Sequence, residues 1–521
     1  PGTEGWQDMY PYYTRFQPED DQRFWFYNSM HFPEPMPAFD IITAEVPYHG
    51  MGAFTSRVFA FPTALGVDHR IINGRIYITA NTVTDPAEIE RRLAVFQKRA
   101  GHYYENWDDI YKEWQERILS LIREIDAIEV PELPEFDDED VVMQARGIAQ
   151  NHYVREAFHR CIEGYTKMWM HHFEMLMLGY GAYVVFFQFC KQAFPEIADQ
   201  TVSRMVSGID VTMFRPDDEL KRLAKLAVEL GIDDLFVEEG DPQNMMDAIG
   251  KQGKEGDKWL AELDKSREPW FNISTGDGFY HHHLSWNEEN HKFYCEHWYT
   301  TRFFKKIREF GQLLQRYDVV DEADDIFHLH YSEAMLALST VMTAWAAGSP
   351  PVAADHWKPV ITRRKQILEK LADWSAPPAL GPIPESIEDP ALQMLWGITS
   401  ETLASWARDP EELDENEING YAASPGVVEG TARVLKNVND IGLMQEGEIL
   451  VCPVTNPSWA PVFGKIKAAV SDIGGTMSHA AIVAREYGMP AVVGTGQATH
   501  RIKTGQRLRV DGDSGIVTIL E

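Results

Sequence analysis

A histidine near the C-terminal end of the chain follows a glycine-rich turn and precedes a small, apolar segment. The run reads Gly474-Gly475-Thr476-Met477-Ser478-His479-Ala480-Ala481-Ile482-Val483-Ala484. The glycines permit a tight turn and close approach to a bulky group. Thr476 or Ser478 can cap the first helical turn, whose unpaired N–H groups and positive dipole end attract an anion. An imidazole placed there can accept a phosphoryl group and hold it against the helix end.

The same run predicts the element that positions this histidine. Its alanines and aliphatic residues suit a helix packed on a sheet, Gly488 is placed to end that helix, and Pro490 prevents a restart. We predict His479 as the nucleophile, with Gly474, Gly475, Thr476 and Ser478 as phosphate-binding residues. Spacing alone also fits an exposed histidine at an ordinary turn, because short motifs often occur by chance.

The segment closely resembles the swivelling phosphohistidine domain of phosphoenolpyruvate synthase, pyruvate phosphate dikinase and rifampin phosphotransferase. The resemblance covers residues 420–521, with matching blocks in the same order at 420–430, 447–451, 455–459, 490–495 and 510–512. In that family the histidine of a Thr-x-Ser-His segment carries the phosphoryl group, and His479 holds this place. The resemblance therefore implies a phosphohistidine intermediate in a dikinase-type phosphotransferase.

Periodicity divides the 521 residues into a mainly helical part and an α/β part. Residues 1–60 are rich in aromatic residues and proline and are predicted to be irregular, 75–79 is a strand candidate, and helical spacing dominates 85–129 and 141–341. Short alternating apolar runs predict strands at 427–434, 448–451, 468–471, 491–494, 507–510 and 516–520. We expect a multidomain chain: a large, mainly α-helical acceptor-binding domain at 1–375, a proline-rich and acidic spacer at 376–419, and a C-terminal α/β swivelling domain at 420–521.

The composition of the chain excludes some classes of binding partner and indicates the cellular compartment. The formal net charge of −32 argues against nucleic acid or an anionic membrane as a partner. The four cysteines, Cys161, Cys190, Cys295 and Cys452, form no Cys-x-x-Cys pair and suit a reducing compartment. We find no signal peptide and no apolar run of about 18 residues. These features predict a cytoplasmic protein.

The sequence lacks a motif for the phosphoryl donor. It contains no Gly-x-x-x-x-Gly-Lys-Ser/Thr loop and no second glycine-rich phosphate cradle. The chain resembles most the phosphohistidine subunit of split systems, the phenylphosphate synthases and 4-cresol-phosphorylating enzymes. That resemblance implies a separate, ATP-grasp-like subunit that binds ATP and Mg²⁺, and a phenolic acceptor such as phenol or 4-cresol.

The region before the spacer resembles, more loosely, the acceptor-binding domain of rifampin phosphotransferase at 287–294, 307–311 and 325–329. Asn290 and Lys292 match the pattern of the relatives, whereas Glu288 stands where they carry arginine. The resemblance places Lys292 near the incoming acceptor oxygen.

A histidine-rich stretch precedes Lys292. His283 is the predicted general base, because a phenol with a pKa near 10 needs help to lose its proton. The remaining predicted acceptor-binding residues are His281, His282, Trp286, Glu288 and His291. Consecutive histidines rarely converge on one zinc, so no metal is expected here. A solvated polar loop is the alternative for the stretch. For the whole chain the alternatives are an antibiotic, pyruvate or a sugar alcohol as acceptor, or a non-catalytic helical scaffold.

Overall fold

The computed structural model describes most of the chain. The described residues are all of 1–521 except 1, 11, 29–30, 33, 137, 146–150, 196, 198–214, 236–247, 272–292, 373, 375, 386–395, 397, 399–402, 404–405, 407–415, 437, 456–458, 473, 475–477 and 521. The chain forms two compact units: unit 1 comprises residues 1–186, 287–393 and 398–407, and unit 2 comprises 187–286, 394–397 and 408–521. Each unit is described by itself.

A four-stranded antiparallel sheet lies in unit 1, in the order β2-β3-β1-β4. Its strands are β1 (Trp25–Tyr27), β2 (Ala64–Ile72), β3 (Arg75–Thr82) and β4 (Ala379–Leu380). Strand β3 confirms the strand expected at 75–79. The prediction that residues 1–60 are irregular is wrong in part, because β1 and a helix with an internal proline, α1 (Ile42–Gly52), both lie there.

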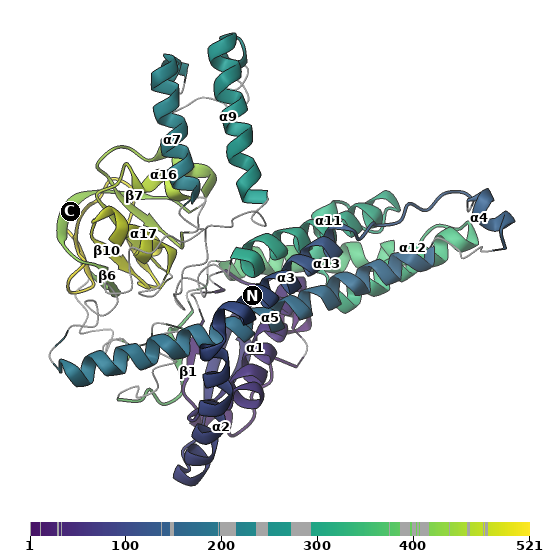
Figure 1. Cartoon of the computed structure of the whole chain (residues 1–521). Helices are drawn as coiled ribbons and strands as arrows, with labels where there is room; N and C mark the ends of the chain where they lie inside the picture. The colour runs from purple at the N-terminus through teal and green to yellow at the C-terminus, as the bar shows by residue number, and fades with distance from the viewer. Residues whose placement is uncertain are drawn as a thin grey trace. The chain divides into compact units, whose positions relative to one another are not determined.

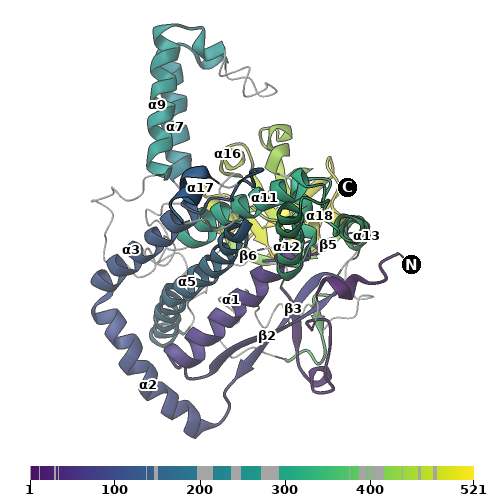
Figure 2. The ribbon, with the colours of Figure 1, turned by 90° about the vertical axis from the view of Figure 1, so that its right-hand side faces the viewer.

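Helices make up the rest of unit 1 (Figures 1 and 2). The longer ones after α1 are α2 (Pro86–Glu105), α3 (Trp107–Asp126), α5 (Asn151–Ala193, which continues into unit 2), α11 (Thr300–Arg316), α12 (Tyr331–Ala347) and α13 (Ala354–Ala372). Short helical segments complete it: η1 (Trp6–Met9), η2 (Asp20–Gln22), η3 (Phe39–Ile41), η4 (Ala53–Val58), α4 (Glu139–Met143), η8 (Phe293–Tyr299) and η9 (Ala323–His328).

Local sequence explains how the first long helix of this region begins. Asp85 caps α2 by accepting a hydrogen bond from the N–H of Ala87 at 3.1 Å, and Pro86 occupies the first turn, where no amide hydrogen is needed. In α3 the buried side chains recur at three- and four-residue spacing, at Trp107, Tyr111, Trp114, Ile118, Ile122 and Ile125. The helical pattern expected over 85–129 is therefore confirmed.

Unit 2 contains an eight-stranded mixed sheet in the order β5-β12-β11-β7-β8-β9-β10-β6. The strands are β5 (Glu417–Asn419), β6 (Tyr421–Ser424), β7 (Val427–Val434), β8 (Ile449–Cys452), β9 (Ala468–Ser471), β10 (Ala491–Val493), β11 (Arg507–Asp511) and β12 (Ile516–Ile519). The central strands β7, β8, β9 and β10 run parallel, and antiparallel strands flank them. This mixed sheet confirms the α/β character expected for the C-terminal region.

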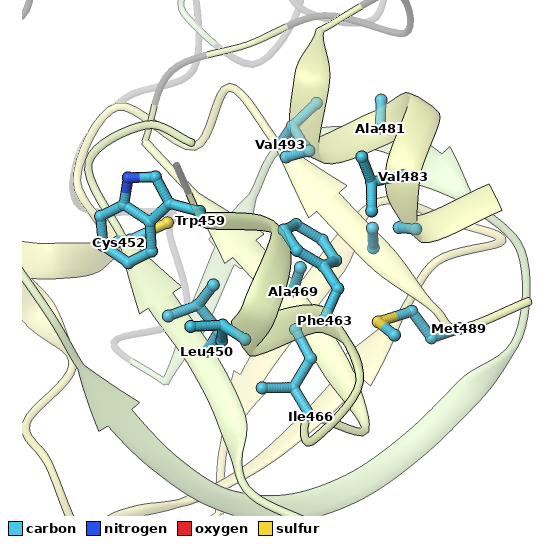
Figure 3. Packing of buried hydrophobic residues seen from close by; sticks show 14 of the residues in the cluster. Leu450, Cys452, Trp459, Phe463, Ile466, Ala469, Ala481, Val483, Met489 and Val493 are labelled. Carbon is cyan, nitrogen blue, oxygen red and sulfur yellow. The ribbon is translucent and has the colours of Figure 1, made fainter. Parts of the chain in front are cut away.

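Alternating side chains of the parallel strands build two hydrophobic layers, one on each face of the sheet. Leu450 and Ala469 enter the layer beneath helices α16 (Ala460–Phe463) and α17 (His479–Tyr487), shown in Figure 3. Ile449 and Val470 enter the opposite layer, which Ala498 of helix α18 (Ala498–Arg501) joins. The crossover β9–α17–β10 between parallel strands is what places the histidine helix on the sheet.

Unit 2 also contains a separate helical pair, α7 (Arg215–Leu230) and α9 (Lys254–Phe271), and the short segments η6 (Asp233–Leu235) and η11 (Val438–Leu443). The pair has a small core of its own, in which Trp259 donates a hydrogen bond to the carbonyl of Leu223 at 3.0 Å.

The predicted spacer begins inside a folded element. Leu380 of β4 pairs with Trp25, and Tyr77 donates its hydroxyl to the carbonyl of Pro377 at 2.8 Å. These contacts tie residues 377–380 to the sheet of unit 1, so a hinge within 376–419 would lie after Leu380. The predicted boundaries at 375 and 420 remain predictions.

Candidate active site

Helix α17 begins at the predicted nucleophile. Ser478 is its N-cap: the backbone there is extended, and the side-chain oxygen accepts a hydrogen bond from the N–H of Ala481 at 3.4 Å. Gly474 precedes the cap with φ of 131°, and a Cβ there would lie 2.6 Å from the Ser478 oxygen. Only glycine fits this point, which explains its place in the motif. Of the two predicted capping residues, Thr476 and Ser478, Ser478 is the N-cap.

The end of α17 also follows the sequence signal. Gly488 adopts a φ of 66°, and the N–H of Met489 donates a hydrogen bond to the carbonyl of Ala484 at 3.0 Å. This is the left-handed glycine termination that commonly ends helices. Ala481 and Val483 are buried against the sheet, as the small apolar run requires. The helix is therefore fixed at both ends and along one face, which gives His479 a defined position.

The imidazole of His479 is half-buried at the first position of α17, and its neighbours include Thr455 and Phe463. Its Nδ1 lies 3.0 Å from the hydroxyl oxygen of the buried Thr455, which follows β8. The ring of Phe463 meets it edge-on, with centroids 5.9 Å apart. A contact through one ring nitrogen restricts the orientation of the imidazole, which is the usual way to aim the other nitrogen for chemistry.

Replacing Thr455 by valine tests this positioning. Valine keeps the shape of threonine but lacks the hydroxyl, so the fold should persist while the imidazole loses its partner. We expect phosphorylation of His479 to slow roughly 3- to 10-fold, the range for one hydrogen bond. Rapid-quench measurement of acid-labile phosphate on the chain gives the rate. Thr455→Ser retains the hydroxyl and should stay near wild type; equal slowing in both variants would show that the contact does not position the ring.

A second polar cluster anchors the turn between β9 and α17. The carboxylate of Asp472, which is 7% exposed, accepts hydrogen bonds from the hydroxyl of Thr495 at 2.9 Å and from the N–H and hydroxyl of Thr499. Burial raises the pKa of the Asp472 carboxyl, and the bonds from the two threonines oppose that rise. The cluster joins the end of β9 to α18, directly before the glycine turn.

Sequence reasoning missed both of these supporting contacts. Thr455 lies inside the block 455–459 that matched the resembled family, but its role needed the spatial approach of β8 to α17. Asp472 follows strand 468–471, and the carboxyl ends of parallel strands commonly carry functional side chains. The position of Asp472 at the end of a predicted strand could therefore have indicated it as a candidate site residue.

Most of the remaining predicted site residues lie outside the described part of the chain. Gly475 and Thr476 belong to that group, so their proposed phosphate contacts stay predictions. The same holds for Lys292, His283 and the other predicted acceptor-binding residues, namely His281, His282, Trp286, Glu288 and His291.

Three further observations concern the described residues alone. They contain no group of three or more His, Cys, Asp or Glu side chains arranged to hold a metal ion. None of their helices combines the length and apolar character needed to span a bilayer. All four cysteines are free and buried, and burial raises the pKa of the Cys161 thiol to about 12.

Comparison with known proteins places the same segment in a family. Residues 444–515 match the family described as PEP-utilising enzyme, mobile domain. The rifampicin phosphotransferase of Bacillus cereus is 50% identical over 110 residues, 21% of this chain and 13% of that protein. The phosphoenolpyruvate synthase of Aquifex aeolicus is 48% identical over 115 residues, again 21% of this chain and 13% of its own length.

A longer match reaches beyond the final sheet. An uncharacterized phosphotransferase of Bacillus subtilis, YvkC, is 31% identical over 234 residues, which are 45% of this chain and 25% of that protein. This match is longer than the segment 420–521, so it includes residues before 420. All three matches span a quarter or less of the relatives' length. Together they support the superfamily resemblance drawn from the motif, and the segment that matches the mobile domain includes His479.

Proposed function

We propose that this chain is a phosphotransferase subunit that relays a phosphoryl group from ATP, through phosphohistidine at position 479, to a hydroxyl acceptor. The observation that carries the proposal is His479 at the capped start of α17, with Nδ1 held by Thr455, inside the mobile-domain match. Since Nδ1 is engaged, we assign Nε2 as the nitrogen that takes the phosphoryl group.

The relay has two half-reactions. In the first, Nε2 attacks the β-phosphorus of ATP and the bond from that phosphorus to the oxygen of AMP breaks; water then attacks the terminal phosphorus and releases inorganic phosphate, which leaves one phosphoryl group on Nε2. In the second, the acceptor oxygen attacks the same phosphorus, the P–N bond breaks, and its electrons return to the imidazole. The amide groups at the start of α17 point their positive dipole end toward the phosphoryl oxygens. Mg²⁺ would neutralise the donor phosphates at the nucleotide site.

The donor site is proposed to lie on a separate, ATP-grasp-like subunit, on the resemblance to split phosphohistidine systems. The acceptor is proposed to be a phenol such as phenol or 4-cresol, on the resemblance to split phenol-phosphorylating systems. Lys292, from the resemblance, is proposed to stabilise the developing charge on oxygen, and His283, from the chemistry of the histidine-rich stretch, is proposed as the general base.

One experiment tests the relay and the acceptor together. The chain is purified from its native source with the proteins that accompany it, and AMP release from ATP is measured across a panel of hydroxyl compounds. AMP release that depends on phenol or 4-cresol supports the proposal. AMP release that depends instead on an antibiotic, pyruvate or a sugar alcohol would show that this compound, and not a phenol, is the acceptor. Failure to form any acid-labile phosphohistidine would favour the alternative that the chain is a non-catalytic helical scaffold.

A separate measurement tests the location of the donor site. Micromolar binding of ATP to the isolated chain, measured by calorimetry, would contradict the proposal that ATP binds on a separate subunit.

A further inference from the structure

We propose that a groove in unit 1 is the docking surface for a segment of the separate donor subunit that carries both basic and apolar side chains. This acidic groove is a hollow of about 650 Å³ between the loop that follows α3 and the first turns of α5, lined by residues of 127–136, 138 and 153–160. All of these residues belong to unit 1. The donor subunit comes from the proposed function, on which this inference rests, whereas the chemistry of the docking segment comes from the groove.

One face of α5 forms a wall of the acidic groove. Tyr153, Glu156, Ala157 and Arg160 all line it. They are spaced three and four residues apart, which places them on a single face of a helix. Ala157 is buried, whereas Tyr153 and the two charged side chains are exposed. This wall therefore has a small apolar floor with aromatic and charged edges.

The opposite wall is a proline-bearing loop that is anchored at several points. Ile128, just after α3, is buried, and the side chain of Asp138 caps α4. Between them, the indole Nε1 of Trp345 in α12 donates a hydrogen bond to the carbonyl of Pro134 at 2.5 Å. Pro131 and Pro134 fix their own φ angles and carry no N–H, which favours an extended loop. The groove is therefore preformed, which keeps the entropic cost of binding a partner low.

The charge of the groove favours a basic partner. Glu129, Glu132, Asp138 and Glu156 contribute four carboxylates, and Arg160 is the one basic side chain among its described lining residues. Complementary charge speeds the encounter of two proteins and fixes which surfaces meet, whereas like charge suppresses the wrong partner. A segment that carries lysine or arginine fits this groove, and an acidic segment does not.

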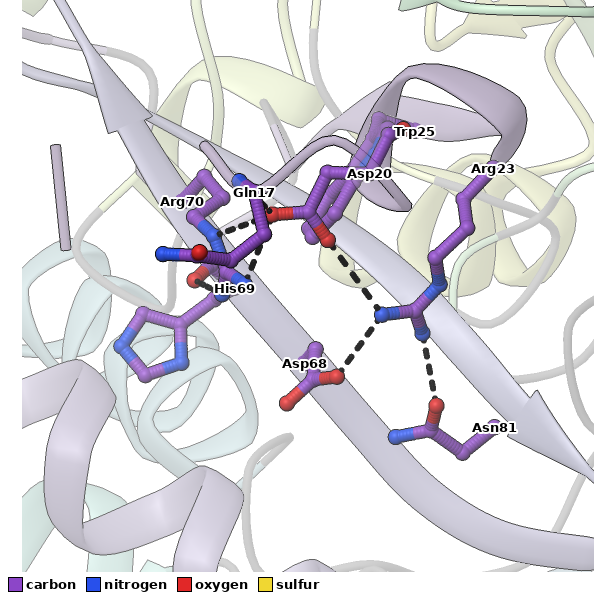
Figure 4. A network of polar contacts seen from close by, with 8 residues as sticks. All are labelled: Gln17, Asp20, Arg23, Trp25, Asp68, His69, Arg70 and Asn81. Atoms are coloured by element: carbon purple, nitrogen blue, oxygen red, sulfur yellow. Dashed lines mark hydrogen bonds and ion pairs between the residues drawn. The ribbon is translucent and has the colours of Figure 1, made fainter. Parts of the chain in front are cut away.

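The ion-pair network of Figure 4, also in unit 1, has a different balance. Arg23 pairs with Asp68 and Arg70 pairs with Asp20, each with an N–O distance of 2.9 Å. Two carboxylates meet two guanidinium groups in that network, whereas four carboxylates and one guanidinium line the acidic groove. The excess of negative charge in the groove is thus a local feature, not a property of every acidic cluster in unit 1.

Exposed apolar side chains at the groove indicate a protein segment. Phe136, which lines the groove, is 79% exposed. A few residues further along the chain, in α4, Val142 and Met143 are exposed as well. Large apolar side chains that are exposed close together commonly mark a site of protein interaction. A docking segment with apolar side chains beside its basic ones would cover them.

The overall charge of the chain argues against a second copy as the occupant. The formal net charge is −32, so another copy would bring like charge to an acidic surface. Nucleic acid and an anionic membrane are disfavoured for the same reason. A different protein with a basic segment fits the groove, and the relay already requires such a separate protein, the donor subunit.

A peptide probe tests the groove without the donor subunit. Fluorescence anisotropy measures the Kd of the full-length chain for a fluorescein-labelled peptide of repeating Lys-Phe-Arg-Leu units. The double variant Glu132→Lys/Glu156→Lys reverses two exposed charges of the groove. We expect the Kd to rise roughly 5- to 30-fold, because two exposed charge pairs are lost and repulsion is added. The difference should shrink at about 0.5 M salt, which screens exposed charges.

The matched control is Glu90→Lys/Glu105→Lys, which makes the same change of net charge at two exposed positions of α2. Its Kd for the peptide should stay within about 2-fold of wild type, since exposed charges more than a Debye length away are screened. Equal weakening in both double variants would show that the peptide responds to net charge alone, and the inference is overturned.

Phe136→Ser tests the apolar part of the surface. Phe136 is exposed, so its loss should leave the fold intact. The Kd for the peptide should rise roughly 3- to 10-fold through the loss of apolar contact. Phe189→Ser, at an exposed phenylalanine of α5 outside the groove, should leave the Kd unchanged. Unchanged binding in Phe136→Ser contradicts a docking segment with apolar side chains.

A second measurement tests the donor subunit as the occupant. Donor protein co-purified from the native source is titrated with ATP against the full-length chain, and acid-labile phosphate on the chain is followed. In Glu132→Lys/Glu156→Lys the donor concentration for half-maximal labelling should rise roughly 5- to 30-fold, as for the peptide. Direct loading of His479 with phosphoramidate needs no donor subunit and should be unchanged.

The outcomes separate this inference from the relay. If the half-maximal donor concentration stays the same in the groove variant, the donor docks elsewhere and the inference is overturned even though the relay is real. If no co-purified protein labels His479 with ATP, the proposed function fails and the donor subunit fails with it as the occupant. Peptide binding that is weakened only by the groove variants would then still support docking of a basic segment.

Discussion

His479→Ala is expected to abolish phosphoryl transfer while leaving the fold of the final domain intact. Alanine has no nucleophile, and removal of a covalent nucleophile costs on the order of 10⁴-fold or more in turnover. The structural cost is small because the imidazole is half-buried, and the hydrogen bond with the hydroxyl of Thr455 is worth about 0.5–1.5 kcal/mol. Alanine also favours the helix, and the Ser478 cap remains.

The measurement compares acid-labile phosphate on the variant and the wild type under the same donor. His500→Ala is the matched control, because His500 is an exposed histidine of α18 in the same unit. It should keep wild-type labelling. Hydrogen exchange over β9 and β10 checks that both variants remain folded. Near-wild-type turnover in His479→Ala would rule out a relay through phosphohistidine at this position.

The sequence predicted the final domain well because its signals are local. Strands at 427–434 and 468–471 were bounded correctly from alternating apolar residues between glycines. The start and end of α17 followed from a capping serine and a terminating glycine, which act within one or two turns. Strand β6 was not predicted, because its short run, Tyr421–Ser424, pairs with a strand far along the chain, β10.

The N-terminal sheet was largely hidden from sequence reasoning. Strand β2 carries Asp68, His69 and Arg70 in its middle, so charged side chains obscure the apolar alternation that marks a strand. Helix α1 contains Pro47, which normally argues against a helix interior. Both elements are stabilised by tertiary contacts, such as that between Tyr48 and His69, which single-sequence patterns do not report.

The same limit applies to the candidate site. Residue types and the turn identified His479, but the contact with Thr455 joins residues 24 positions apart along the chain. In unit 1, Tyr331 likewise donates a hydrogen bond to Glu45, and these two residues are 286 positions apart. Such contacts arise only when helices and strands pack, so sequence spacing could not have indicated them.

Phe463→Ala should strongly destabilise the final domain. Phe463 of α16 is 1% exposed and lies in the hydrophobic layer between α17 and the sheet. Its ring also packs near the ring of Tyr487, with the two ring centroids 6.4 Å apart. Truncating a buried phenylalanine to alanine costs about 3–5 kcal/mol through lost burial and the cavity that remains. Domains are typically stable by only about 5–15 kcal/mol, so this loss is a large fraction of the total.

Hydrogen exchange measured by mass spectrometry is the suitable readout, because a chain with two units need not unfold in one step. Amides of β9 and β10 should exchange roughly 10²- to 10⁴-fold faster in Phe463→Ala, whereas peptides from α3 and α11 in unit 1 should keep their rates. Leu443→Ala is the control, since Leu443 is 60% exposed in the same unit and its truncation should cost less than about 0.5 kcal/mol. Unchanged protection of β9 and β10 in Phe463→Ala would show that the layer beneath α17 does not hold the histidine helix on the sheet.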